Sequence, residues 1–173
     1  MKIIIGIDPG LQRTGWGIIK SSGNSLSYID CGVIKSDAAE NLAKRIAALH
    51  EGISKVIARH NPDEAAVEET FVNKNAMSSL KLGHARGAAI LSVTLAGIPV
   101  HEYAALLVKK TVTGVGRAEK PQVQAMVSHI LPTARNMTAD SADALAVAIC
   151  HASHMGMRKI LEPSLREGLS KRI

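Results

Sequence analysis

The order of strand-like and turn-like segments in the first 35 residues restricts the fold more than any other feature of the sequence. Residues 2–7 form a run of β-branched isoleucines, and residues 14–21 alternate apolar side chains with glycine. Residues 26–35 follow a Ser-Gly-Asn turn and are again rich in apolar side chains. Runs of this kind, separated by turn residues, are typical of strands. Three consecutive strands joined by short turns predict an antiparallel meander.

The segments after the meander predict a crossover that returns the chain to the same sheet. Apolar side chains recur every three or four residues over 42–56, which predicts a helix with one apolar stripe. Asn61-Pro62-Asp63 ends this helix, and residues 64–68 then predict a fourth strand. A helix between two strands of one sheet is the usual crossover connection.

The remainder of the chain predicts four more helices and one more strand. We expect helices over 76–96, 103–113 and 119–131, a fifth strand over 98–102, and a last helix that Thr138 caps and that ends near His154. The predicted fold is α/β, with a five-stranded mixed sheet flanked by helices. Residues 1–155 are expected to form one domain, and residues 156–173, which lack a clear period, a loose and flexible C-terminal tail.

The charge of the chain directs attention to polyanionic partners. Lysine and arginine number 21 against 15 acidic residues, so the net charge is +6 and the isoelectric point is about 9.5. This excess favours nucleic acid first and an acidic membrane surface second. No apolar run reaches the length that a bilayer needs, and the N-terminus lacks a signal-peptide pattern. Cys31 and Cys150 have no metal-type spacing, which indicates reduced thiols in a cytoplasmic protein.

Four acidic residues stand out by their placement. Asp8 ends the first predicted strand, Glu68 ends the fourth, and Asp140 and Asp143 lie in the first turn of the last helix. Taken singly, each has a structural explanation, since Asp8 can brace the Pro9-Gly10 turn and Asp140 can complement a helix dipole. If strands one and four are neighbours, however, their carboxyl ends bring Asp8 and Glu68 together. The helix then adds two more carboxylates at the same place.

Carboxylates gathered in one place repel each other, and their pKa values rise unless a cation neutralises them. Oxygen ligands without histidine or cysteine suit Mg²⁺ or Mn²⁺. Two such ions about 4 Å apart can clamp a phosphodiester, one activating water and the other stabilising the leaving oxygen. An acidic metal cluster within a basic protein therefore predicts a metal-dependent nuclease.

Gly83 and Gly87 lie one turn apart within the helix predicted over 76–96. A glycine inside a helix costs about 1 kcal/mol relative to alanine. Close approach of a second helix, as in a dimer interface, is one explanation, and a tolerated weak point in the helix is the other. The glycines alone do not decide between them.

Five motifs give the chain a resemblance to a known family. They are GIDPG at 6–10, VEETF at 67–71, KNAMSSLKLGHARG at 74–87, GVGRAEK at 114–120 and ADSADALA at 139–146. In this order they resemble the RuvC family of bacterial Holliday junction resolvases over roughly residues 1–154. The resemblance implies a ribonuclease-H-like fold, a homodimer, and paired symmetric nicks in four-way DNA junctions that leave 5′-phosphate ends, in recombination and repair. It also implies Mg²⁺, for which Mn²⁺ can substitute, two ions per site, and partners of the RuvA and RuvB type.

The resemblance also implies roles for individual residues. Its metal-binding acids are Asp8, Glu68, Asp140 and Asp143, the third being a histidine in some members, and Lys109 and Lys120 lie near the scissile phosphate. Glu69 stands where some relatives carry glutamine. Phe71 matches the aromatic residue that wedges into bases at the crossover. The full set of expected DNA contacts is Phe71, Lys74, Asn75, Lys81, Arg86, Lys110 and Arg117, and the dimer interface is expected at Gly83 and Gly87.

Three other functions are weighed against a junction resolvase. A related nuclease that trims ribosomal RNA precursors shares an opening like GIDPG, but the segments KNAMSSLKLG and ADSADALA argue against it. An actin-like or sugar-kinase ATPase needs a duplicated domain and a second phosphate loop, which this chain lacks. A non-catalytic junction-binding protein should have lost one of the four acids, and all four are present.

Overall fold

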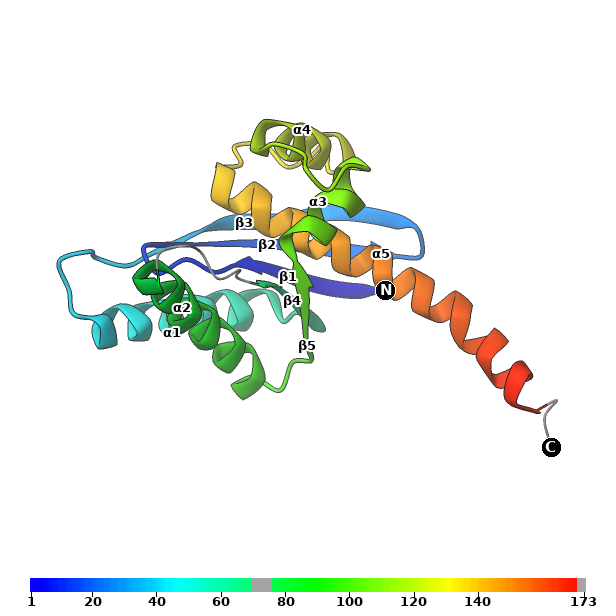
Figure 1. Ribbon diagram of the computed structural model, residues 1–173, viewed down its shortest axis with the longest axis horizontal. Helices are drawn as coiled ribbons and strands as arrows, with labels where there is room; N and C mark the ends of the chain where they lie inside the picture. Colours follow the sequence, from blue (N-terminus) through cyan, green and yellow to red (C-terminus); the bar gives the residue numbers. More distant parts are fainter. Residues whose placement is uncertain (70–75, 171–173) are drawn as a thin grey trace.

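A computed structural model describes residues 1–69 and 76–170, with side chains up to residue 155. It contains one five-stranded sheet in the order β3-β2-β1-β4-β5 (Figure 1). The strands are β1 (Lys2–Asp8), β2 (Arg13–Ser22), β3 (Ser25–Lys35), β4 (Glu64–Glu69) and β5 (Val100–Ala104). Strands β1 to β3 are antiparallel neighbours, whereas β4 runs parallel to β1 and β5 parallel to β4. The predicted meander, crossover and mixed sheet are confirmed, with β5 beginning two residues later than expected.

The helices cover both faces of the sheet. They are α1 (Leu42–His60), α2 (Ala76–Leu95), α3 (Ala105–Thr113), α4 (Lys120–Ile130) and α5 (Ala139–Ser170). In Figure 1, α1 and α2 lie on one face, while α5 crosses the other face with α3 and α4 stacked outside it. The prediction that the last helix ends near His154 is wrong, because α5 continues to Ser170. A helix that is already nucleated propagates at low cost, so a clear apolar period is not needed for this extension.

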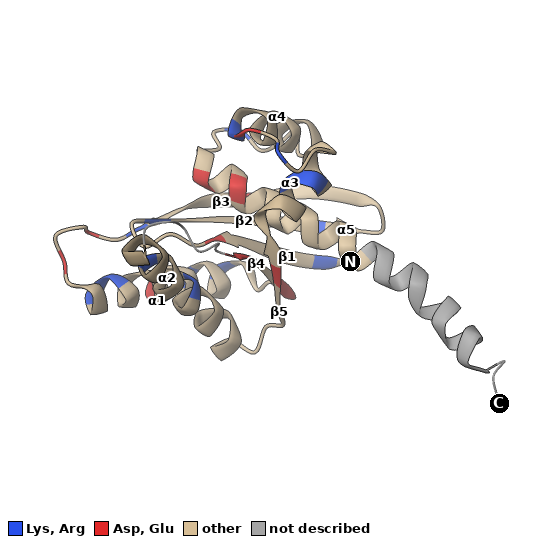
Figure 2. Ribbon diagram, viewed as in Figure 1, with Lys and Arg blue, Asp and Glu red and all other residues tan. Residues whose placement is uncertain are grey.

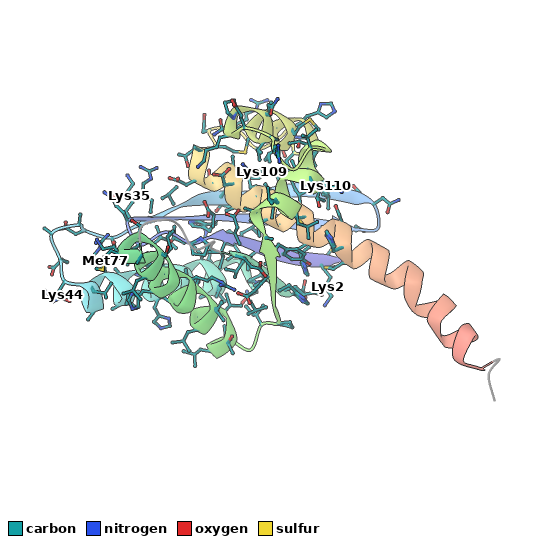
Figure 3. The ribbon with its side chains drawn as sticks, in the orientation of Figure 1. Lys2, Lys35, Lys44, Met77, Lys109 and Lys110 are labelled. Carbon is teal, nitrogen blue, oxygen red and sulfur yellow. The ribbon has the colours of Figure 1, made fainter. Side chains whose placement is uncertain are left out.

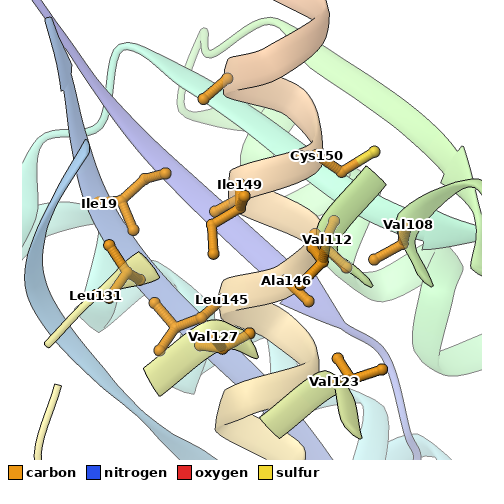
Figure 4. Packing of buried hydrophobic residues seen from close by; sticks show 14 of the residues in the cluster. Ile19, Val108, Val112, Val123, Val127, Leu131, Leu145, Ala146, Ile149 and Cys150 are labelled. Atoms are coloured by element: carbon orange, nitrogen blue, oxygen red, sulfur yellow. The ribbon is translucent and has the colours of Figure 1, made fainter. Parts of the chain in front are cut away.

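Side-chain alternation along the strands divides the core into two layers. Ile5 and Ile7 of β1 pack toward α1 and α2, whereas Ile4 packs toward α5. On β4, Val67 belongs to the first layer and Ala66 to the second. Figure 4 shows the α5 layer, in which Ile19 of β2 meets Leu145, Ile149 and the valines of α3 and α4. Because successive side chains alternate, Asp8 and Glu68 share the α5 face with Ile4 and Ala66.

Two glycines let α5 lie directly against the sheet backbone. A Cβ atom at Gly6 of β1 would lie 2.1 Å from the carbonyl oxygen of Ala144, and one at Gly15 of β2 would lie 2.0 Å from that of Asp140. Only glycine permits such an approach. The start of α5 is therefore seated over the carboxyl end of β1, which places Asp143 above the strand ends.

Candidate active site

Three carboxylates meet where β1 and β4 end beneath α5. The parallel register pairs Ile7 with Val67, so the next residues, Asp8 and Glu68, lie side by side. Asp143 of α5 completes the group, and all three line a pocket of about 240 Å³. That volume is several times the roughly 30 Å³ that one water occupies in the liquid. The expectation that neighbouring strand ends bring Asp8 and Glu68 together at the start of a helix is confirmed.

The electrostatics of this group are those of crowded, partly buried acids. Burial, followed by the charge of Glu68, a hydrogen bond with Glu68 and the charge of Asp143, raises the pKa of Asp8 to about 8. Burial is also the main cause that raises the pKa of Glu68. Two carboxyl groups that share a hydrogen bond in such surroundings retain one proton between them near neutral pH. Without a cation, we therefore expect Asp8 and Glu68 to share one proton near neutral pH.

Two lysines reach the same pocket from α3 and α4. Lys109 and Lys120 both line it, and Lys120 Nζ lies 3.1 Å from Asp143 Oδ2. The hydrogen bond and charge of Asp143 raise the pKa of Lys120, so this ammonium group stays charged at neutral pH. Figure 2 shows the acidic first turns of α5 close to basic segments of α3 and α4. The lining of the pocket thus combines three acidic side chains with two lysines.

Asp140 makes a contact that differs from those of the other three acids. It contacts Arg13, whose Nε lies 2.5 Å from Asp140 Oδ2, and it is not among the residues that line the pocket. Arg13 is brought there by the turn after Pro9-Gly10, in which Thr14 Oγ1 donates to the carbonyl oxygen of Gly10 at 2.8 Å. No sequence motif assigned Arg13 a role, and its position directly after the turn was the available signal.

The start of α5 is capped as expected. Ser141 N–H donates to Thr138 Oγ1 at 3.3 Å, and Thr138 N–H donates to Ser141 Oγ at 2.9 Å. This reciprocal pair holds the first turn of α5, which contains Asp140, and Asp143 follows in the next turn.

The other expected DNA contacts are spread over the molecule. Lys81 on α2 and Lys110 on α3 are exposed, and Figure 3 labels Lys110 beside Lys109 on the same short helix. Arg117 lines a separate hollow of about 640 Å³ beside α4. Arg86 is engaged within the chain, because its guanidinium group donates to Glu102 of β5. Phe71, Lys74 and Asn75 lie outside the described residues.

A sheet of this strand order, with a cluster of carboxylates where its parallel strands β1 and β4 end, defines a ribonuclease-H-like nuclease. Among the described residues, no helix is both long and apolar enough to cross a membrane.

Comparisons with known proteins narrow this class to a family. The family model described as crossover junction endodeoxyribonuclease RuvC matches residues 4–151. The RuvC of Methylorubrum populi is 61% identical over 153 residues, covering 88% of this chain and 81% of that protein. The RuvC of Azorhizobium caulinodans is 58% identical, covering 88% of this chain and 90% of that protein. The chain belongs to the RuvC family of crossover junction endodeoxyribonucleases.

Solved structures agree with this assignment. Thermus thermophilus RuvC in complex with a Holliday junction substrate superposes with a TM-score of 0.84 at 32% identity, covering 91% of this chain and 96% of that chain. The yeast mitochondrial Holliday junction resolvase superposes with a TM-score of 0.62 at 10% identity, which shows a shared fold alone.

Proposed function

We propose that this protein resolves four-way DNA junctions by paired symmetric nicks, each made by hydrolysis of one phosphodiester at a pocket formed by Asp8, Glu68 and Asp143. The observation that carries the proposal is the convergence of these three acids with Lys109 and Lys120 in a chain of the RuvC family. The Thermus thermophilus relative was solved with a Holliday junction substrate, which supports the same substrate here. The biological setting that follows is homologous recombination and DNA repair in the bacterial cytoplasm, where the DNA substrate lies.

The donor set of the pocket fits Mg²⁺, with Mn²⁺ as a substitute, and we assign two ions to each site. Asp8, Glu68 and Asp143 offer only carboxylate oxygens, which are the ligands that hard divalent cations prefer. Burial first, and then the charges of Glu68 and Asp143, raise the pKa of Asp8, and a bound cation would offset both effects. When bound, such ions polarise the phosphate and lower the pKa of a coordinated water. Asp140 would join the ligands through its other carboxylate oxygen or by leaving Arg13.

The side chains of the pocket divide the remaining work. Lys120 is held beside Asp143 and stays protonated, so it can contact a non-bridging phosphate oxygen. Lys109 approaches Glu68 from α3 and adds a second positive charge where negative charge develops. We propose in-line attack by water on the phosphorus, with departure of the 3′ oxygen and a 5′-phosphate on the other strand end. No covalent enzyme intermediate is required.

We further propose that two copies pair through α2. Gly83 and Gly87 are exposed, and a Cβ atom at either would meet nothing within 4 Å among the residues that the structure describes. The same side of α2 exposes large apolar side chains, of which Figure 3 labels Met77. Their exposed fractions are 62% for Met77, 54% for Leu80, 55% for Leu91 and 68% for Leu95. Such a contiguous apolar face with glycines suits a symmetric helix contact, and a two-fold dimer would present two sites to a two-fold junction.

The test is cleavage of a labelled four-way junction, a linear duplex and an RNA–DNA hybrid, with and without Mg²⁺. We expect paired symmetric nicks in the junction alone, and only with the metal. Asp8→Asn should abolish cleavage and leave junction binding largely intact, whereas Glu51→Gln, at an exposed site on α1, should change neither. Cleavage of the hybrid would instead favour a nuclease of RNA, and binding without nicks a non-catalytic junction protein.

The remaining expected contacts follow from the same substrate. Lys81, Lys110 and Arg117 are exposed on the described surface and can reach phosphates outside the pocket. Interaction with junction-binding and branch-migration proteins of the RuvA and RuvB type is proposed from family membership alone.

A further inference from the structure

A second polar cluster lies between the sheet and α5, away from the acid pocket. Glu64 begins β4, His101 lies on β5 and His151 on α5. Glu64 and Glu68 are four residues apart on one strand, roughly 13 Å at strand rise. His151 follows Asp143 by eight residues, roughly 12 Å along a helix. The two sites therefore lie between the same strand and the same helix, at positions separated by a similar distance along each.

The three side chains converge on one oxygen atom. Glu64 Oε2 lies 2.9 Å from His151 Nε2 and 3.6 Å from His101 Nε2, and the ligand atoms of the three residues all lie within 4.8 Å of one another. Around a four-coordinate zinc ion with bonds of about 2.0–2.1 Å, neighbouring ligand atoms are separated by about 3.4 Å. The observed separations bracket that value, so small side-chain movements suffice for coordination.

A contact between Nδ1 and a neighbouring hydroxyl fixes the ring of His151, as the second ring nitrogen of a metal-bound histidine is usually fixed. His151 is 1% exposed, and its Nδ1 lies 2.8 Å from Tyr103 Oη. In the chain without metal, Nε2–H donates to the Glu64 carboxylate at 2.9 Å and the tyrosine hydroxyl donates to Nδ1. A bound cation would replace the Nε2 proton, and Nδ1–H would then donate to the tyrosine oxygen. A metal-bound histidine commonly donates its other ring N–H to an oxygen in this way, which fixes the ring and its tautomer.

One cation already lies beside the cluster. Lys2, labelled in Figure 3, reaches Glu64 through the other carboxylate oxygen, with Nζ 3.5 Å from Oε1. Oε2 is thus left to the two histidines. The rings of His101 and His151 stack with centroids 4.5 Å apart, an arrangement that two imidazolium cations would oppose.

We propose that Glu64, His101 and His151 form a binding site for a zinc-class divalent cation, distinct from the acid pocket. Two imidazoles and one carboxylate are a borderline-soft donor set that favours zinc over magnesium. Three protein ligands leave a fourth position for water. A bound ion would cross-link the first residue of β4, a residue of β5 and a residue in the middle of α5. It would therefore stabilise the packing of this helix on the sheet.

Zinc titration by calorimetry, with Mg²⁺ in excess to occupy the acid pocket, tests the proposal on the full chain. We expect about one zinc per chain for the wild type, for Asp8→Asn and for His129→Gln, a control at an exposed histidine of α4. His101→Gln should weaken zinc binding by at least 100-fold, beyond the roughly 10–100-fold cost of losing a supporting partner. His101 is partly exposed, so this variant is expected to fold, which its circular dichroism will check.

A spectroscopic measurement identifies the ligands independently of affinity. Substituted Co²⁺ should give the visible absorption of a four-coordinate nitrogen and oxygen site in the wild type and in Asp8→Asn, and lose it in Glu64→Gln and His101→Gln. Zinc binding that is unchanged in His101→Gln, that disappears in Asp8→Asn, or that is absent from the wild type would overturn the proposal. The last result would leave the cluster as a hydrogen-bonded network among Tyr103, His151 and Glu64.

Discussion

Without metal, the Asp8→Asn variant should become increasingly stable relative to the wild type as the pH rises. The same change should abolish cleavage. Asp8 has an ordinary pKa of 3.8 and a folded-state pKa of about 8, raised by burial and by Glu68 and Asp143. Below pH 3.8 the group is protonated in both the folded and the unfolded chain, and its contribution to stability is complete. Between 3.8 and 8 the unfolded chain ionises while the folded chain keeps the proton, so that contribution is progressively lost.

The magnitude follows from the width of this interval. Each pH unit within it lowers the free energy of unfolding of the wild type by about 1.4 kcal/mol relative to a chain that lacks the titration. From pH 5 to pH 7, Asp8→Asn should therefore gain about 3 kcal/mol on the wild type. For a chain of this length, that corresponds to a melting-temperature difference that grows by roughly 5–10 °C.

Urea unfolding in EDTA at pH 5, 6 and 7, on the wild type, Asp8→Asn and the exposed control Glu51→Gln, measures this difference. Glu51→Gln should track the wild type. Saturating Mg²⁺ should reverse the order at pH 7, because the ion stabilises only a folded state that retains its ligands. A difference between Asp8→Asn and the wild type that stays constant with pH, or that shrinks as the pH rises, would refute the assignment of a retained proton to this pocket.

Four further perturbations test separate parts of the structure. Lys120→Met should lower kcat by about 100- to 1,000-fold at saturating junction and leave the melting temperature nearly unchanged; a loss confined to KM would contradict a role in the transition state. Arg13→Met frees Asp140 from its ion pair, so half-maximal cleavage should need less Mg²⁺; an unchanged requirement would exclude Asp140 from the metal ligands. Gly6→Ala forces α5 off the sheet and should destabilise the fold by about 1–3 kcal/mol in denaturant unfolding. Leu91→Glu should convert the proposed dimer to a monomer in light scattering without loss of helicity, and a persistent dimer would place the interface elsewhere.

Local patterns were sufficient for most of the fold. Isoleucine runs, turn residues and helical stripes depend on neighbours within a few positions, so the five strands and most helix boundaries could be predicted. The length of α5 could not, because residues 156–173 carry no clear apolar period and the extension follows from a helix already formed before them. Likewise, the placement of Asp8 beside Glu68 was predictable once the crossover made β1 and β4 neighbours.

The sequence by itself determined which acids occupy strand ends and the first turn of α5, because alternation and capping are local properties. Only the tertiary structure decided which of them meet. Asp140 and Asp143 share a helix face, yet Asp143 joins the pocket and Asp140 pairs with Arg13, 127 residues away along the chain. Glu64 and His151 are 87 residues apart and converge only because α5 crosses β4 and β5. Such contacts depend on how closely a helix can approach a sheet, which glycine positions permit but which no local pattern specifies.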